Sequence, residues 1–254
     1  MAAACGCQGN PPCRIAIHSA PPEHVGLGTG TQLGLAVAAG VYPLLSTVPA
    51  SAEQLAAIAG RGARSAIGTH GFASGGLLFE QGKHADEALS SLTERSPLPE
   101  AWRFVLCWPD DHRGLSGDAE REAFGRLPDV PSETTRMLTS IAKQEVLPAA
   151  AAGDVNAFGD AVYRYGHAAG MCFADYQPGA FASPRVQALV NAIRALGVPG
   201  AGQSSWGPTV FAVVGDETRA GALVAQLKAD AQFAKLSCLI AAPNNRGAEV
   251  TFHA

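Results

Sequence analysis

A glycine-rich stretch near the start of the chain carries the residue types best suited to chemistry. It reads PEHVGLGTGTQLGLAV over residues 22–37, and its centre is, in order, Gly26, Leu27, Gly28, Thr29 and Gly30. Glycines permit a tight turn with N–H groups aimed at one spot, and the apolar run at residues 31–39 predicts a helix whose positive dipole end faces that spot. The stretch therefore predicts a site for phosphate or pyrophosphate. The alternative is a plain loop before a buried helix.

Polar side chains at the same turn favour a ligand over a plain loop. They are the hydroxyl groups of Thr29 and Thr31 and the amide of Gln32. Pro22 precedes the turn and His24 lies beside it. For His24 two interpretations stay open, a proton relay and a structural histidine.

Two pairs of charged residues follow. Arg61 and Arg64 lie among glycines in residues 60–83, where two guanidinium groups either fork onto a phosphate or carboxylate or form a solvated helix-end pair. Asp110 and Asp111 follow the apolar strand predicted at residues 103–108. Carboxylates at the carboxyl end of a strand can hold magnesium or orient a substrate, and the alternative here is a solvated turn.

A second glycine turn lies late in the chain. It reads GQSSWGPTV over residues 202–210 and runs into the strand predicted at residues 209–214. Its candidate site residues are Gln203, Ser204, Ser205, Trp206 and Gly207.

Composition excludes several classes of protein. The 254 residues carry 18 Lys and Arg against 22 Asp and Glu, a net charge of −4, so nucleic acid is not expected as a partner. No apolar run is long enough to cross a bilayer, and the N-terminus lacks the basic and apolar regions of a secretory signal. Cys107, Cys172 and Cys238 lie in apolar segments typical of core residues, and the clustered Cys5, Cys7 and Cys13 lack zinc-site spacing. We expect a reduced, cytoplasmic enzyme that does not bind membranes.

The elements that position these residues can be predicted coarsely. Hydrophobic periodicity and turn residues predict strands at residues 13–18, 76–80, 103–108, 209–214, 236–241 and 248–252. Helices are predicted at residues 31–39, 52–59, 132–150, 154–172, 184–196 and 218–233, with N-caps at Ser51 and in the SETT that begins at Ser132.

The glycine stretch resembles the phosphate-binding signature of the GHMP kinase superfamily, a proline followed by Gly-Leu-Gly-Ser-Ser-Ala. Together with GRGARSAIG, FVLCWPDD and GQSSWGPTV, the chain from Cys13 onward resembles the β-ribofuranosylaminobenzene 5′-phosphate synthase branch of that superfamily. The resemblance implies an α+β fold with two domains. Residues 13–97 would form a part like ribosomal protein S5 domain 2, and residues 98–254 a ferredoxin-like C-terminal domain. Residues 1–12 are expected to be a disordered lead-in.

The resemblance also implies an activity. In this family 4-aminobenzoate joins phosphoribosyl pyrophosphate, releasing carbon dioxide and pyrophosphate with Mg²⁺, in methanopterin biosynthesis, and its members are homodimers. Arg61 and Arg64 would neutralise the 5′-phosphate or the benzoate carboxylate, and Asp110 and Asp111 would help hold Mg²⁺. The wall facing the pyrophosphate would be the second turn, with Trp206 as a stacking surface for the ring. The pyrophosphate cradle would be Gly26, Gly28, Thr29, Gly30 and Thr31.

Three departures separate the chain from the superfamily's kinases. Gly30 stands where the signature has its second serine, residues 68–70 (Gly-Thr-His) lack the kinase aspartate, and the late turn differs. A phosphoryl transferase without the metal-holding hydroxyl and the base would be a poor kinase. Few residues precede the glycine loop, so the first strands of the N-terminal domain are expected to be missing. Either the start is truncated or misassigned, or this copy has lost part of that sheet, which would leave a sheet edge for dimer pairing or aggregation. The alternatives to the synthase are an ATP-dependent small-molecule kinase and an inactive ligand-binding relative.

Overall fold

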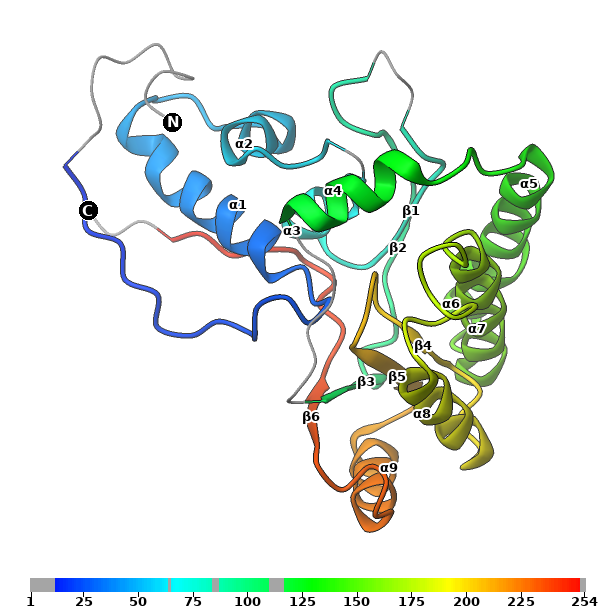
Figure 1. Cartoon of the computed structure of the whole chain (residues 1–254). Coiled ribbons are helices and arrows are strands. Elements are labelled where there is room, and N and C mark those ends of the chain that lie inside the picture. The colour runs from blue at the N-terminus through cyan, green and yellow to red at the C-terminus, as the bar shows by residue number, and fades with distance from the viewer. Residues whose placement is uncertain (1–11, 64, 84–86, 110–116, 252–254) are drawn as a thin grey trace. The chain divides into compact units, whose positions relative to one another are not determined.

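The computed structural model describes residues 12–63, 65–83, 87–109 and 117–251, and the side chains of residues 117–121 are not described. The chain divides into two compact units (Figure 1). The first unit comprises residues 1–23, 28–97 and 244–254, and the second comprises residues 24–27 and 98–243. The units differ from the sequence-based boundary between residues 97 and 98 in two short stretches. Residues 24–27 belong to the second unit instead of the first, and residues 244–254 belong to the first unit instead of the second.

The first unit consists of helices and a two-stranded antiparallel sheet. Its helices are α1 (Thr29–Val41), the 3₁₀ turn η2 (Tyr42–Leu44), α2 (Ala52–Ala59) and α3 (Ile67–Ser74), and its strands are β1 (Leu77–Glu80) and β2 (Leu92–Ser96). Ser51 caps α2, as the sequence predicts, and it does so through a reciprocal capping box with Gln54. Gly60 ends the helix in the left-handed conformation.

The second unit is built on a four-stranded antiparallel sheet in the order β4–β5–β3–β6. The strands are β3 (Arg103–Pro109), β4 (Ala201–Gln203), β5 (Val210–Val214) and β6 (Leu236–Ala241). The helices are α4 (Gly117–Arg126), α5 (Ser132–Ile141), the π-helical turn η3 (Ala142–Val146), α6 (Leu147–Ala152), α7 (Val155–Met171), α8 (Pro184–Ala195) and α9 (Glu217–Ala229).

The core of the second unit lies between this sheet and two helices. Val190 and Ile193 of α8 and Leu227 of α9 are almost fully buried against Val105 and Val210 of the sheet. At about 25 cal/mol per Å² of apolar area, side chains of this kind supply most of the stability of the unit. This antiparallel sheet with packed helices agrees with the predicted ferredoxin-like domain.

Several predicted elements are wrong. Residues 13–18 and 248–251 form no strand, because a strand needs a hydrogen-bonded partner and neither run has a ladder among the described residues. Ser132 is the first residue of α5 and not its cap, and α9 ends at Ala229 rather than at residue 233. The sequence did not predict α3, α4, β2 or the short strand β4. Helix α3 forms despite two glycines because tertiary packing overrides its weak intrinsic propensity.

Helix α7 approaches the start of β4 so closely that only glycine fits at one position. A Cβ atom on Gly159 would lie 2.6 Å from the backbone nitrogen of Gly200 and 2.7 Å from its Cα. Since backbone cannot move aside cheaply, the glycine pair sets the distance between α7 and the sheet.

We predict that Gly159→Ala lowers the free energy of unfolding by about 2 kcal/mol, through overpacking of this contact. Gly166→Ala is the matched control, because it lies in the same helix with open space around its Cβ position. There the removal of glycine from a helix interior should raise the stability by about 0.5–1 kcal/mol. Urea unfolding midpoints measure both changes, and equal effects at the two positions would contradict the close-approach argument.

Candidate functional site

The first bend of the glycine loop is anchored to the second glycine turn within the second unit. The hydroxyl of Ser204 donates a hydrogen bond to the carbonyl oxygen of Gly26 at 2.6 Å. The carbonyl oxygen of Val25 accepts two hydrogen bonds from Thr209, from its backbone N–H at 3.2 Å and from its hydroxyl at 2.5 Å. The structure therefore brings together two bends that lie about 180 residues apart in the sequence.

Glycine is required at position 26 for two reasons. Its φ of +88° is a conformation that residues with side chains rarely adopt. A Cβ atom there would also lie 2.6 Å from the carbonyl oxygen of Ser204 and 3.1 Å from that of Gly207. The close contact between the two bends thus depends on the absence of a side chain at this position.

The second turn is held in shape by its own side chains. The amide of Gln203 accepts a hydrogen bond from the backbone N–H of Ala182 at 2.6 Å and donates one to the carbonyl oxygen of Ser205 at 2.8 Å. Ser205 is exposed at the tip of the turn with a positive φ of 53°, a strained conformation for a serine. Gln203 and Ser204 therefore brace the turn, and Ser205 is the residue whose side chain it presents.

The indole of Trp206 is a packing group in this structure. It is 8% exposed and makes edge-type contacts with the rings of Phe124 and Phe173, at centroid distances of 5.3 and 4.9 Å. These contacts fix the base of the turn. The predicted role of Trp206 as a stacking surface for a substrate ring stays a prediction.

In the first unit, helix α1 begins at the glycine loop. Gly28 is its N-cap in the left-handed conformation, and its carbonyl oxygen accepts from the N–H groups of Thr31 and Gln32. The hydroxyl of Thr29 donates to the carbonyl oxygen of Pro22 at 3.0 Å, which holds the preceding chain. The first turn of α1 contains no acidic side chain, so no carboxylate of that turn neutralises the positive end of the helix dipole.

A cation lies beside this positive helix end. The Nη2 atom of Arg61 is 3.3 Å from the position that a Cβ on Gly30 would occupy, and its Nε is 3.7 Å from the corresponding position on Gly34. Within the described part of the chain, the exposed guanidinium of Arg61 makes no recorded ion pair. A positive side chain next to a helix N-terminus is unfavourable without an anion. The guanidinium and the helix N-terminus together would suit a phosphate group.

Helix α3 shows the opposite arrangement at its N-terminus. The carboxylate of Glu80 accepts from the N–H of Ala66, the N-cap residue, at 3.0 and 3.3 Å. The side chain of Gln32 donates to the carbonyl oxygen of Gly68 at 2.8 Å, so α3 is tied to the first turn of α1. The chain itself therefore supplies the anion at α3.

No catalytic base emerges from α3. Thr69 is 2% exposed within the packed interior, and the Nε2 atom of His70 lies 2.9 Å from the carbonyl oxygen of Ser90. Both side chains point to structural roles. Two residues with structural roles were not singled out from the sequence. Glu80 bonds to the start of α3 in the first unit, and Thr209 holds the carbonyl oxygen of Val25 in the second unit.

The remaining predicted site residues can be placed as follows. Leu27 and Thr31 are partly buried, and His24 is exposed with a positive φ of 61°. Arg64, Asp110 and Asp111 lie outside the described residues. Among the residues that the structure describes, no group of three or more His, Cys, Asp or Glu side chains could hold a metal ion.

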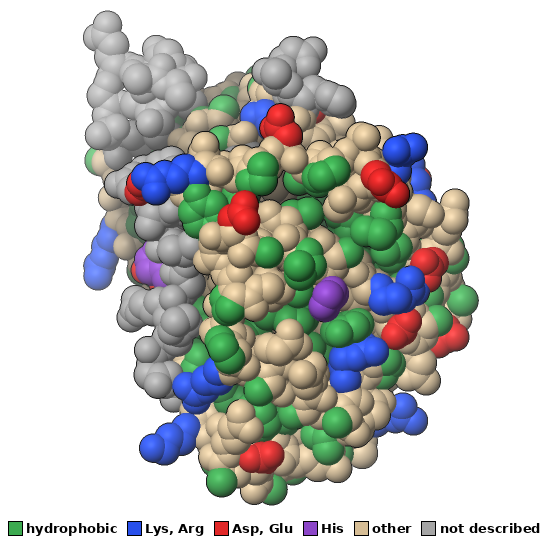
Figure 2. Space-filling view, turned by 45° about the vertical axis from the view of Figure 1, so that its right-hand side comes forward, with side chains coloured by type: hydrophobic (Ala, Val, Ile, Leu, Met, Phe, Trp, Pro, Cys, Tyr) green, Lys and Arg blue, Asp and Glu red, His purple; other side chains and the backbone are tan. Residues whose placement is uncertain are grey.

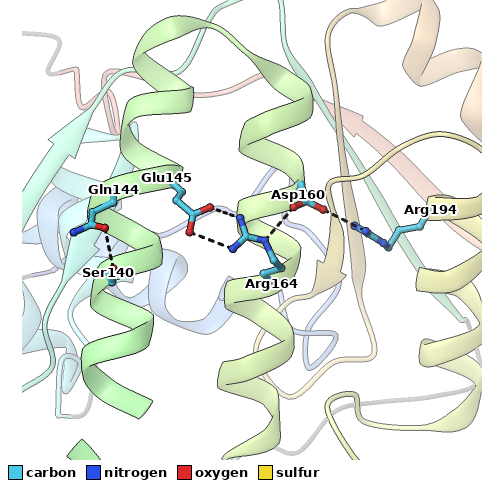
Figure 3. Close-up of polar contacts among 6 residues, drawn as sticks. All are labelled: Ser140, Gln144, Glu145, Asp160, Arg164 and Arg194. Atoms are coloured by element: carbon cyan, nitrogen blue, oxygen red, sulfur yellow. Dashed lines mark hydrogen bonds and ion pairs between the residues drawn. The ribbon is translucent and has the colours of Figure 1, made fainter. Parts of the chain in front are cut away.

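A cluster of charged side chains on the helices of the second unit is structural rather than catalytic (Figure 3). Arg164 of α7 pairs with Glu145 of η3 and with Asp160, and Arg194 of α8 pairs with Asp160 at 3.4 Å. Hydrogen bonds from Arg164 lower the pKa of both carboxyl groups below their ordinary values. In the face drawn in Figure 2, blue and red side chains are interspersed among apolar ones.

Comparison with known proteins identifies the family. The model for the GHMP kinase N-terminal domain matches residues 1–76, and the model for the GHMP kinase C-terminal domain matches residues 146–232. The chain is 30% identical over 253 residues to the β-ribofuranosylphenol 5′-phosphate synthase of Archaeoglobus fulgidus. This match covers 89% of this chain and 72% of the relative. The chain belongs to the family of β-ribofuranosylphenol 5′-phosphate synthases.

A second synthase of the family, from Methanothermobacter thermautotrophicus, is 32% identical over 213 residues. That match covers 79% of this chain and 63% of the relative, so the chain spans less than two thirds of its length. Solved structures with the same fold include homoserine kinase from Cytophaga hutchinsonii (TM-score 0.57, 15% identity, 89% of this chain and 69% of that one). Mevalonate diphosphate decarboxylase from Staphylococcus aureus also shares it (TM-score 0.59, 16% identity, 87% and 66%). No described helix is both long and apolar enough to span a membrane.

The two serines of the second turn should respond oppositely to substitution. We predict that Ser204→Ala lowers the free energy of unfolding by about 1 kcal/mol, because it leaves the Gly26 carbonyl oxygen without this donor. Ser205→Gly, the matched control, should leave the stability unchanged or raise it by about 0.5–1 kcal/mol, because glycine tolerates a positive φ. Thermal unfolding of both variants measures the difference, and a loss of stability at Ser205 alone would contradict this account.

Proposed function

We propose that this chain catalyses a decarboxylating phosphoribosyl transfer from phosphoribosyl pyrophosphate to a para-substituted benzoate. The products would be a ribofuranosyl arene 5′-phosphate, carbon dioxide and pyrophosphate. The observation that carries the proposal is the start of α1 in this member of the synthase family. Its first turn contains no acidic side chain, and the Arg61 guanidinium lies 3.3 Å from the Cβ position of Gly30 in that turn.

The chemistry needs charge stabilisation more than it needs a nucleophilic side chain. As the bond from C1 of the ribose to pyrophosphate breaks, negative charge grows on the leaving group. The N–H groups at the start of α1 and the guanidinium of Arg61 would stabilise that charge. The ring carbon that carries the carboxylate then bonds to C1, and loss of carbon dioxide restores aromaticity. Holding the ring against C1 supplies much of the remaining rate enhancement.

Kinase activity is less well supported. The positions where the superfamily's kinases would place their base are a buried threonine, Thr69, and a histidine, His70, whose Nε2 lies at a carbonyl oxygen. The carboxylate of Glu80, near the start of α3, is bonded to the N–H of Ala66. Among the described residues of α3, a phosphoryl transfer from ATP to a hydroxyl group would therefore find no positioned carboxylate base.

Two aromatic substrates are candidates for the acceptor of the phosphoribosyl group. The family resemblance implies 4-aminobenzoate, whereas the name of the relatives specifies a phenol in the product. The two acceptors differ only in the para substituent, an amino group or a hydroxyl group. Both would lose the same carboxylate and form the same bond to C1.

Magnesium stays a proposal of its own. The described residues do not form a magnesium site, because they contain no cluster of three candidate ligands and the hydroxyl of Thr29 is already bonded to Pro22. Asp110 and Asp111, the predicted ligands, lie outside the described residues. A homodimer and a cytoplasmic location are further proposals; the thiols of Cys13, Cys107, Cys172 and Cys238 are unpaired by disulfides, which fits a reducing compartment.

The proposed reaction is tested by release of labelled carbon dioxide from carboxyl-labelled 4-aminobenzoate and 4-hydroxybenzoate. We expect release from at least one acceptor, dependent on phosphoribosyl pyrophosphate and matched by pyrophosphate formation. The assay is run with Mg²⁺ and with excess chelator, which tests the metal separately. Consumption of ATP with a hydroxyl acceptor would instead select the kinase, and binding of phosphoribosyl pyrophosphate without any product would select the inactive relative.

We predict that Arg61→Ala raises KM for phosphoribosyl pyrophosphate about 10–100-fold, because a charge-assisted contact to phosphate is worth about 1.5–3 kcal/mol. Arg61→Lys should recover part of the loss, since it keeps the charge without the planar fork. Arg136→Ala, which removes an exposed arginine from α5, is the control for net charge and should leave KM unchanged. An Arg61→Ala enzyme with an unaltered KM for both substrates would remove Arg61 from the site.

A further inference from the structure

Two cysteines lie opposite each other on neighbouring strands of the four-stranded sheet in the second unit. Cys107 of β3 and Cys238 of β6 are directly opposite partners in the antiparallel ladder, although they lie 131 residues apart in the sequence. Their Sγ atoms are 3.4 Å apart, within contact distance for a thiol hydrogen bond. Opposite residues of antiparallel strands have Cα atoms about 4.5–5.5 Å apart, a range that disulfides also span.

The two thiols differ in their access to solvent. Cys107 lies on β3, an inner strand, and its exposed fraction is 0%, within the core cluster. Cys238 lies on β6, the edge strand, and is only partly buried against the same cluster. A small oxidant from solvent therefore reaches the sulfur of Cys238 first.

The thiols also differ in acidity. The hydrogen bond from Cys107 and the nearby Lys228 ammonium lower the pKa of Cys238, against the opposing effect of partial burial. The hydrogen bond to Cys238, together with burial, raises the pKa of Cys107. The Nζ atom of Lys228 is held beside β6 by hydrogen bonds to the carbonyl oxygens of Ala234 and Leu236. Thiolate character is thus concentrated on the more accessible sulfur, as in redox-sensitive cysteines.

We propose that Cys107 and Cys238 form a peroxide-sensitive dithiol that closes reversibly to an intramolecular disulfide. The thiolate of Cys238 attacks one oxygen of hydrogen peroxide, which breaks the O–O bond and gives a sulfenic acid and hydroxide. The sulfur of Cys107 then attacks the sulfenic sulfur, the S–O bond breaks, and the departing hydroxide takes the Cys107 proton. Overall, two thiols and one hydrogen peroxide give one disulfide and two water molecules.

This inference is independent of the proposed function, since it rests only on the pairing of β3 and β6. Closure would staple the edge strand β6 to the strand that carries most of the sheet pairing. A cross-link between residues 107 and 238 closes a loop of more than 100 residues, and such links stabilise the folded state substantially when they form without strain.

The test is peroxide titration of the native full-length chain, followed by alkylation of the remaining thiols and peptide mapping. We expect a disulfide-linked peptide pair containing Cys107 and Cys238 as the first product, reversed by dithiothreitol. Thermal unfolding of the oxidised chain should shift upward by about 5–10 °C. Cys172 is the internal reference, because burial raises the pKa of its thiol and it should react later.

Two variants separate the steps. Cys107→Ser should leave a sulfenic acid on Cys238 that dimedone traps, because the resolving thiol is absent. Cys238→Ser should leave Cys107 unmodified at peroxide concentrations that oxidise the native chain fully. Because residue 107 lies in the core, circular dichroism first confirms that each variant is folded. If the native chain gives separate oxidation of the two thiols with no linked peptide, the proposal is overturned. Faster reaction of Cys172 than of Cys238 would overturn it as well.

Discussion

Three hydrogen bonds from the second glycine turn hold the first bend of the glycine loop, at Val25 and Gly26, in place within the second unit. They run from Ser204 to the carbonyl oxygen of Gly26 and from Thr209 to that of Val25. Thr209 is fully buried, so an unmade bond there would leave a polar group without compensation. Because of these bonds, residues 24–27 belong to the second unit, although Gly28 begins the part of the chain that forms α1 in the first unit. Residues 24–27 are therefore held by the second glycine turn of the same unit.

The electrostatics of the first unit separate a site from a structural contact. Helices α1 and α3 start close together, tied by Gln32 and the carbonyl oxygen of Gly68. The chain supplies Glu80 to the N-terminus of α3, and at α1 it supplies Arg61 instead. A folded protein would gain nothing from a cation at a positive helix end unless an anion bound there for part of the working cycle. The contrast between the two neighbouring helices is thus stronger support for an anion site than the glycine pattern alone.

Local signals in the sequence predicted the local features well. The N-cap at Ser51, the helix after Gly28 and the buried strand at Arg103 were all predicted, because each depends on residues close by in the sequence. The failures depend on distant partners. Residues 13–18 alternate like a strand but have no ladder, and α3 forms despite its glycines because Gln32 and Glu80 hold it from elsewhere in the chain. For the same reason the bracing roles of Gln203 and Thr209 could not be predicted, since their partners Ala182 and Val25 are distant in sequence.

The departure from the kinase signature at Gly30 lies beside Arg61 in this structure. A Cβ atom at that position would lie 3.3 Å from Nη2 of Arg61, a tight contact that the flexible side chain of Arg61 would relieve by a small shift. Gly30 leaves the guanidinium room beside the first turn of α1, and it offers no hydroxyl to a metal ion. A turn without that hydroxyl is poorly equipped to position a metal ion for phosphoryl transfer, whereas a guanidinium beside a helix start can still stabilise an anion.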